Sequence, residues 1–222
     1  MTKRLNCTSK ASVYLFILSS IFISNTSNAA IIHIEPDSFI DGTNIEAAYA
    51  GVTLSVEGRP DAAVFTVDGY DVFNNRNIAT SGSLVFGNTP VPSSVPSGKV
   101  WDETTFGLFR ADFDYSTNYV QIDLIYDDDD IGGLWAYDSV GNLIESVTAS
   151  GDGRGSVPFT TVSISRQTND IAYILAGGVN AEALFLDNMQ YNAVSAVPVP
   201  AAVWLFGSGL IGLIGLARRK NS

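Results

Sequence analysis

The chain contains one cysteine, Cys7, and one histidine, His33, among 222 residues. A single cysteine excludes an intramolecular disulfide framework and any zinc module built on cysteines. A single histidine excludes metal sites built from several histidines, and it leaves acid–base chemistry mainly to carboxylates. The protein is therefore expected to fold without oxidation.

Positive charge is also scarce. The chain has 12 Lys and Arg against 23 Asp and Glu, a formal net charge of −11. Half of the basic residues lie in the first ten or the last five positions, so the region between them carries −17. An unassisted nucleic-acid-binding protein needs a basic face to neutralise phosphates, and this class is excluded. Disorder is disfavoured, because 12 Phe, 9 Tyr and 3 Trp can build a core.

The N-terminal segment, residues 1–29, has the pattern of a secretory signal peptide. Three basic residues in the first ten positions precede an uncharged apolar run over residues 11–23. That run would rise about 20 Å as a helix, which is too short to span a hydrocarbon core of about 30 Å. The small residues Ser27 and Ala29 predict cleavage after Ala29, with cleavage after Ala30 as the alternative.

A second apolar segment lies near the C-terminus. Residues 201–217 are uncharged and would form a helix of about 26 Å, enough to span a bilayer. Arg218, Arg219 and Lys220 follow as a basic stop. By the positive-inside rule these residues stay in the cytoplasm, which places residues 30–197 on the outer side of the inner membrane.

The C-terminal residues read VPVPAAVWLFGSGLIGLIGLARRK. This combination of a proline pair, an apolar helix and a basic end resembles a PEP-CTERM sorting domain, residues 198–222, in its VPLPAAVWLFGSGLLGL variety. The proline motif comprises Val197, Pro198, Val199 and Pro200, and Val199 stands where the standard motif has Glu. The resemblance implies export through the Sec machinery of a Gram-negative bacterium and a transient stay in the inner membrane. It further implies that an exosortase removes the helix, and that the protein is delivered to the cell surface or the exopolysaccharide matrix. A permanent membrane anchor is the alternative.

The central region, residues 30–197, has the length of one domain and lacks a helical period. Short alternating runs separated by Gly, Asn, Asp and Pro predict a β-sandwich. The clearest alternation places Val120, Ile122 and Leu124 on one face of a strand. The expected strands are residues 51–56, 63–67, 83–86, 106–113, 119–126, 134–138, 143–148, 161–165, 171–175 and 183–191.

Three sequence stretches resemble jelly-roll domains of surface proteins. They are IDGTNIEAAYAGVTLS over residues 40–55, WAYDSVGNL over residues 135–143 and FLDNM over residues 185–189. The resemblance implies an all-β, galactose-binding-like jelly roll. Within the second stretch, the segment from Asp138 to Asn142 has the composition of a hairpin turn.

Two groups of carboxylates are candidates for a structural calcium ion, and no other cofactor is expected. Calcium takes six to eight oxygen ligands, mostly carboxylates and carbonyls. One group unites Asp37 and Asp41, early in the domain, with Asp187 near its end, because first and last strands are neighbours in jelly rolls. The other is a contiguous run, Asp127, Asp128, Asp129 and Asp130. A strand cap and a solvated loop are the respective alternatives.

Aromatic side chains suggest a carbohydrate contact. Trp101 and Trp135, together with Tyr119 and Tyr137, could stack on the apolar faces of sugar rings. Packing in the core is the alternative for both tryptophans.

Catalysis has little support in the sequence. There is no Gly-x-Ser-x-Gly motif, and His33 lies too close to the expected mature N-terminus to serve a catalytic triad. With 23 acidic residues, pairs of carboxylates at glycosidase spacing arise by chance. No catalytic residue is assigned and the protein is not expected to be an enzyme.

Together these patterns predict an exported surface or matrix protein with a structural or adhesive role. Polysaccharide is the expected partner, in an exopolysaccharide or biofilm setting. The alternatives are a carbohydrate-active enzyme and a permanently anchored envelope protein.

Overall fold

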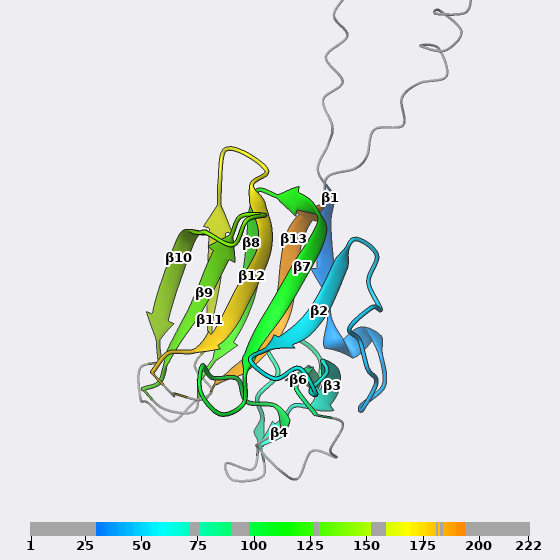
Figure 1. Ribbon diagram of the computed structural model, residues 1–222. Coiled ribbons are helices and arrows are strands. Elements are labelled where there is room, and N and C mark those ends of the chain that lie inside the picture. The colour runs from blue at the N-terminus through cyan, green and yellow to red at the C-terminus, as the bar shows by residue number, and fades with distance from the viewer. Residues whose placement is uncertain are drawn as a thin grey trace, which may run out of the picture.

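The computed structural model describes residues 30–71, 76–89, 98–126, 129–151, 159–180, 182 and 184–193. Two antiparallel sheets pack face to face, as Figure 1 shows. Sheet A contains β1 (Ala30–Ile34), β3 (Phe65–Asp68), β6 (Leu84–Gly87), β8 (Tyr119–Ile125), β11 (Phe159–Ser165) and β13 (Phe185–Ala193). Sheet B contains β2 (Val52–Glu57), β7 (Leu108–Thr117), β9 (Ile131–Tyr137), β10 (Leu143–Ser150) and β12 (Ile171–Gly178).

The strand order in sheet A is β11-β8-β13-β6-β3, with β1 added to β13, and the order in sheet B is β10-β9-β12-β7-β2. The remaining elements are the short pair β4 (Tyr70–Asp71) and β5 (Arg76–Asn77) and one 3₁₀ turn, η1 (Pro36–Ser38). The all-β prediction and the two-sheet architecture are confirmed.

Each of the ten predicted strands overlaps a strand of the structure, whereas β1 was not predicted. The sequence from Ala30 to Ile34 adjoins the expected cleavage site, so its apolar residues were not recognised as a strand. In the structure β1 pairs with the last strand, and Ala30 lies opposite Ala193. The two ends of the described domain therefore lie side by side (Figure 1).

The core lies between the two sheets and follows the alternation of the strands. On β8 the predicted inward residues Val120, Ile122 and Leu124 have no exposed surface. They belong to one continuous apolar cluster that includes Leu54 of β2 and Phe109 of β7. Burial of such side chains contributes about 25 cal/mol for each Å² of apolar surface removed from water, which makes this cluster the main source of stability.

The predicted turn between β9 and β10 is confirmed. The Asp138 carboxylate accepts hydrogen bonds from the backbone amides of Val140 and Asn142 and from the Asn142 side chain. These bonds, that of the Asn142 side chain first, lower the pKa of Asp138. Gly141 has φ +86°, a left-handed conformation that favours glycine.

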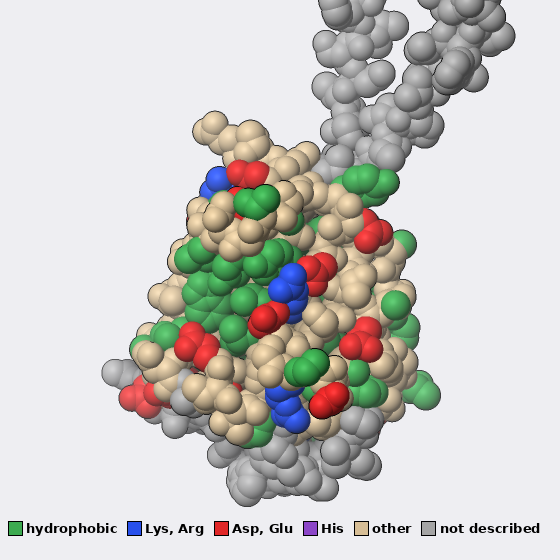
Figure 2. Space-filling model, viewed as in Figure 1, with side chains coloured by type: hydrophobic (Ala, Val, Ile, Leu, Met, Phe, Trp, Pro, Cys, Tyr) green, Lys and Arg blue, Asp and Glu red, His purple; other side chains and the backbone are tan. Residues whose placement is uncertain are grey.

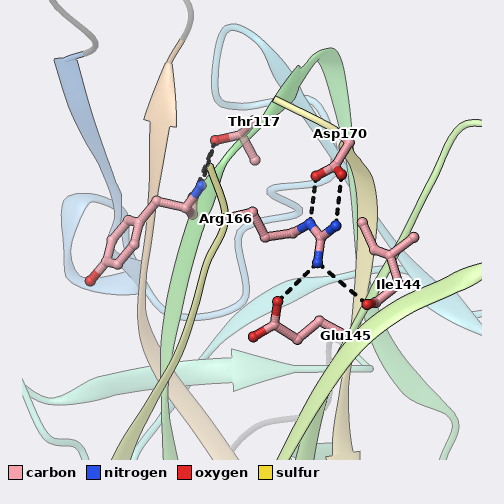
Figure 3. A network of polar contacts seen from close by, with 6 residues as sticks. Thr117, Ile144, Glu145, Arg166 and Asp170 are labelled. Carbon is pink, nitrogen blue, oxygen red and sulfur yellow. Dashed lines mark hydrogen bonds and ion pairs between the residues drawn. The ribbon is translucent and has the colours of Figure 1, made fainter. Parts of the chain in front are cut away.

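An arginine joins the two sheets at one edge of the sandwich. Arg166, just after β11, forms a two-pronged ion pair with Asp170, whose two oxygens lie 2.6 and 2.8 Å from its guanidinium nitrogens. The same guanidinium donates to the Glu145 carboxylate and to the backbone carbonyl of Ile144 on β10 (Figure 3). Because β10 belongs to sheet B and β11 to sheet A, this network holds the sheet edges together.

The targeting segments lie outside the described residues. This applies to the signal peptide with Ala29, to the motif from Val197 to Pro200, and to the basic stop from Arg218 to Lys220. Within the described ranges, no helix is long and apolar enough to cross a membrane. The predicted span over residues 201–217 is not among those ranges.

Candidate binding face

The outer face of sheet B carries a band of aromatic and aliphatic side chains. Strand register aligns them in rows across the sheet. Trp135 on β9 lies opposite Leu175 on β12, which lies opposite Arg110 on β7. In the next row Tyr137 lies opposite Tyr173. Their neighbours along each strand point into the core, so these side chains point outward and are only partly buried.

Figure 2 shows this face in the orientation of Figure 1. Hydrophobic side chains gather over β9, β10 and β12, and basic and acidic side chains adjoin them on the side of β7. An apolar surface of this kind, bordered by charged groups, is typical of an interaction site. We call the surface formed by Trp135, Tyr137, Tyr173 and Leu175 the platform.

The Trp135 ring leans back over its own strand. An ideal Cβ placed on Gly133 would lie 2.5 Å from Cζ2 and 2.6 Å from Cη2 of the Trp135 indole. The six-membered ring of Trp135 thus lies over Gly133, two residues earlier on the same side of β9. Trp135 is half-buried, so part of its indole remains open to solvent.

Tyr137 and Tyr173 form a stacked pair beside Trp135. Their ring centroids are 4.7 Å apart and the ring planes differ by 2°. The guanidinium carbon of Arg110 lies 4.0 Å from the centroid of the Tyr173 ring. A ring offers two faces, so Tyr173 is sandwiched between Tyr137 and Arg110. Three planar groups from three neighbouring strands therefore form one stack, which makes this part of the face rigid.

Arg110 is fixed by two carboxylates. Its guanidinium binds both oxygens of Asp112 at 2.8 and 2.7 Å, and Glu57 at 2.9 Å. These pairs, the one with Asp112 first, raise the pKa of Arg110. The two carboxylates together more than neutralise the guanidinium.

The surroundings of Tyr137 show how the charges border the platform. Burial is the main cause that raises the pKa of Tyr137, and its neighbour Tyr173 adds to this effect. The negative charges of Glu57 and Glu103 raise the pKa further. Both glutamates are exposed, so the platform has acidic neighbours that water and ligands can reach.

Trp101 does not belong to this face, and the prediction of an exposed sugar contact at this residue is wrong. The side chain has no exposed surface. Its Nε1 donates a 3.0 Å hydrogen bond to the carbonyl oxygen of Phe86, and its ring packs edge-to-face on Phe109. Trp101 is a core residue, and its backbone forms an isolated bridge with Leu184 next to β13.

The carboxylates of Asp37, Asp41 and Asp187 do not assemble into a calcium site. Within the described ranges, no three Asp, Glu, His or Cys side chains are arranged to hold a metal ion. Asp37 instead accepts backbone amides of Ser83 and Leu84, and Asp41 accepts that of Asp68. Asp129 and Asp130 lie between β8 and β9, and Asp127 and Asp128 are outside the described residues.

Asp187 has a different and unexpected environment. It is fully buried on β13, opposite Asp123 of β8, which is 2% exposed. One Asp187 oxygen accepts the backbone amides of Thr80 and Ser81 at 2.8 and 3.1 Å. The Thr80 hydroxyl lies 2.7 Å from Asp123 and 3.0 Å from Asp187, so the two carboxylates share it. Burial raises the pKa of Asp187 to about 6, although the amide and hydroxyl donors act to lower it.

The sequence indicated Trp135 and Tyr137 as sugar contacts but not the residues that organise them. Gly133, Tyr173 and Arg110 are brought to Trp135 and Tyr137 by register, since they lie on three strands. The available signal was the alternation over residues 131–137, which places Gly133, Trp135 and Tyr137 on one side of β9. Tyr119 lies on β8 of the other sheet, where its hydroxyl donates to Gln121.

No protein-family model and no curated protein matches the chain. Among solved structures, TmCBM61 in complex with β-1,4-galactotriose is 12% identical, with a TM-score of 0.36, over 70% of this chain and 98% of that chain. The K1 cleaved adhesin domain of Lys-gingipain from Porphyromonas gingivalis W83 is 9% identical, with a TM-score of 0.34, over 74% and 98%. The enzymatically active domain of tailspike protein 4 from bacteriophage CBA120 is 16% identical, with a TM-score of 0.32, over 72% of this chain but 21% of that chain. At these values the likeness assigns no function.

Proposed function

We propose that this domain is a carbohydrate-binding module that holds polysaccharide on the outer face of sheet B. The observation that carries the proposal is the placement of the half-buried Trp135 ring over Gly133, on the outer face of sheet B. A pyranose ring has an apolar face made of C–H groups, and an exposed indole face is a matching surface. The chemistry is binding without turnover, in a galactose-binding-like jelly roll.

The groups around Trp135 complement a sugar in other ways. The stack of Tyr137, Tyr173 and Arg110 holds the side chains beside the indole in place before a ligand binds. Little side-chain entropy is therefore lost on binding. Glu57 and Glu103 offer exposed carboxylate oxygens that accept hydrogen bonds from sugar hydroxyls. Stacking on the indole supplies affinity, and the carboxylates that accept hydrogen bonds from sugar hydroxyls set the orientation of the sugar.

We further propose that the domain acts outside the cell, as a surface or matrix protein sorted by exosortase. Support comes from the signal-peptide pattern of residues 1–29 and from the PEP-CTERM-like tail of residues 198–222. Mass spectrometry of the surface-exposed protein tests this proposal. A mature C-terminus near Pro200 is the expected result, and retention of residues 201–222 would contradict it.

Affinity electrophoresis through gels containing soluble polysaccharides tests the binding proposal. The panel contains β-1,4-galactan, hydroxyethyl cellulose, dextran and soluble starch. At least one polymer is expected to retard the protein. Trp135→Ala should weaken that binding about tenfold, equivalent to ~1.4 kcal/mol, at the upper end of the range for a good aromatic contact.

The matched control is Tyr115→Ala, which removes an exposed aromatic side chain elsewhere on the molecule. Tyr115 is 65% exposed and borders a small cavity with Ile32 and Tyr191, away from the platform. Its removal should leave retardation unchanged. Equal retardation of the wild type and Trp135→Ala would contradict the proposed site, and no retardation by any polymer would contradict the proposed function.

A further inference from the structure

The charges around the platform narrow the class of polysaccharide. Three carboxylates border the platform. Glu57 and Asp112 bind Arg110, whose guanidinium lies over the Tyr173 ring. Glu103 is exposed and follows Asp102, whose backbone bridges Gly178 at the end of β12. Arg110 already binds both oxygens of Asp112 and one of Glu57. Three of its five N–H donors and its charge are therefore committed to the protein, and the border of the platform is net negative.

The other basic residues in the described part of the chain do not offset this charge. Arg166, at the β10 edge, is paired with Asp170 and Glu145. Lys99 is 1% exposed and donates to backbone carbonyls. Arg59 lies in the turn after β2 with its Cγ near Gly107, and the border stays net negative because three carboxylates face two guanidinium groups. Arg76 lies on β5, outside sheet B.

We infer that the platform selects uncharged polysaccharides and rejects acidic ones. The inference rests on the proposed function and goes beyond it, because it specifies the substrate class. A neutral sugar brings hydroxyl donors to the exposed carboxylates of Glu57 and Glu103, which are acceptors only. A uronate or sulfated sugar would bring a like charge to a partly desolvated contact where the neighbouring cation, Arg110, is already paired.

The rejection is expected to depend on salt. Charges at an exposed border interact over about 10 Å at 0.1 M salt, and this range shrinks to about 3 Å at 1 M. Stacking on Trp135 is not screened by ions. Binding of a neutral polymer should therefore change little with salt, whereas the discrimination against its acidic derivative should diminish.

Three matched polymer pairs test the inference with the full-length protein. They are hydroxyethyl cellulose and carboxymethyl cellulose, dextran and dextran sulfate, and soluble starch and carboxymethyl starch. In at least one pair the neutral member should bind at least tenfold more tightly at 50 mM NaCl. The double variant Glu57→Gln/Glu103→Gln should narrow that ratio at least threefold, because it removes two negative charges and leaves Asp112 alone to balance Arg110.

The control variant is Glu46→Gln, which alters the protein charge without touching the platform. Glu46 lies before β2 and binds the Asn44 side chain. It should leave the ratio unchanged. If an acidic member binds as tightly as its neutral partner, the inference is overturned while the proposed function stands. If neither the members of these pairs nor β-1,4-galactan bind, the proposed function itself is contradicted.

Discussion

At the scale of single residues, the platform depends on a glycine that makes no polar contact. Gly133 has no side chain, and this absence allows the Trp135 ring to lie on the strand backbone. Any Cβ at this position would occupy space that the ring fills. The orientation of the Trp135 ring on the platform is thus determined by a residue two positions earlier on the same strand.

Gly133→Ala should weaken polysaccharide binding while the fold persists. The new methyl group would lie 2.5 Å from the indole and force the Trp135 ring away from the strand. We expect a loss of affinity of about tenfold, similar to that of Trp135→Ala, because the same stacking contact is removed. Affinity electrophoresis measures the loss, and far-UV circular dichroism checks the fold.

The suitable control is Gly42→Ala, between η1 and β2, where φ is +81° and an added Cβ would meet no atom within 4 Å. It should lower stability by about 1 kcal/mol, because its left-handed backbone disfavours a side chain. It should not change binding. An unaltered affinity in Gly133→Ala would show that polysaccharide binding does not need the Trp135 ring to lie over Gly133.

Asp187 is the residue whose titration should dominate the pH dependence of stability at mildly acidic pH. Its pKa is about 6 in the folded protein, above the ordinary value of 3.8. The unfolded chain therefore releases this proton at lower pH than the folded protein does. As pH rises from about 4 through 6, this residue makes the folded state progressively less stable, by about 2 kcal/mol.

Urea denaturation at pH 4, 5, 6 and 7 measures this contribution by comparing the wild type with Asp187→Asn. The free energy of unfolding of the wild type, relative to the variant, should fall by about 2 kcal/mol across the series. Asp41→Asn serves as the control, because this exposed carboxylate also accepts one backbone amide. Parallel pH profiles for the wild type and Asp187→Asn would contradict the assignment.

Residue type alone could not separate the two tryptophans of the domain. Both lie in plausible loop or strand patterns, but Trp101 has a buried partner for its Nε1 in the Phe86 carbonyl. Trp135 lies on the outer side of a strand whose alternation the sequence reveals. The distinction comes from tertiary placement, which a single sequence does not encode locally.

At the scale of elements, strand alternation predicted all but the first of the long strands. The run from Val120 to Leu124 is a clear case, because its apolar residues recur with period two and face the core. The strand β1 escaped prediction, since its partner β13 lies at the other end of the chain. The register between distant strands could not be predicted from the sequence either. It is this register that places Tyr173 beside Tyr137.

The ion-pair network at the sheet edge is the element-scale feature with a direct test. Arg166→Gln removes the charge that joins Asp170 and Glu145 across the two sheets (Figure 3). The variant should melt at a lower temperature than the wild type. Because these groups are partly exposed, the difference should shrink in 1 M NaCl.

Double-variant analysis separates the ion pair from packing. In the background of Asp170→Asn, the effect of Arg166→Gln should be smaller than in the wild type. Additive losses, or a melting difference that does not respond to salt, would show that Arg166 acts through its aliphatic stem instead.

At the scale of the whole molecule, the two sheets have different outer surfaces. Sheet B presents the platform, whereas the Thr80–Ser81 loop covers part of sheet A over the buried Asp123 and Asp187. The described ends meet at Ala30 and Ala193 (Figure 1). A tail that continues from Ala193 would leave the domain beside its N-terminus, and the platform lies on a separate face.

Hydroxyl-radical footprinting of the protein with and without a polysaccharide that it binds tests the central claim most directly. Oxidation of Trp135, read by peptide mass spectrometry, should fall at least threefold in the bound protein. Oxidation of Tyr115 should stay the same, and Trp101 should be protected in both states because it is buried. Unchanged oxidation of Trp135 in a protein saturated with polysaccharide would contradict the assignment of the outer face of sheet B as the binding surface.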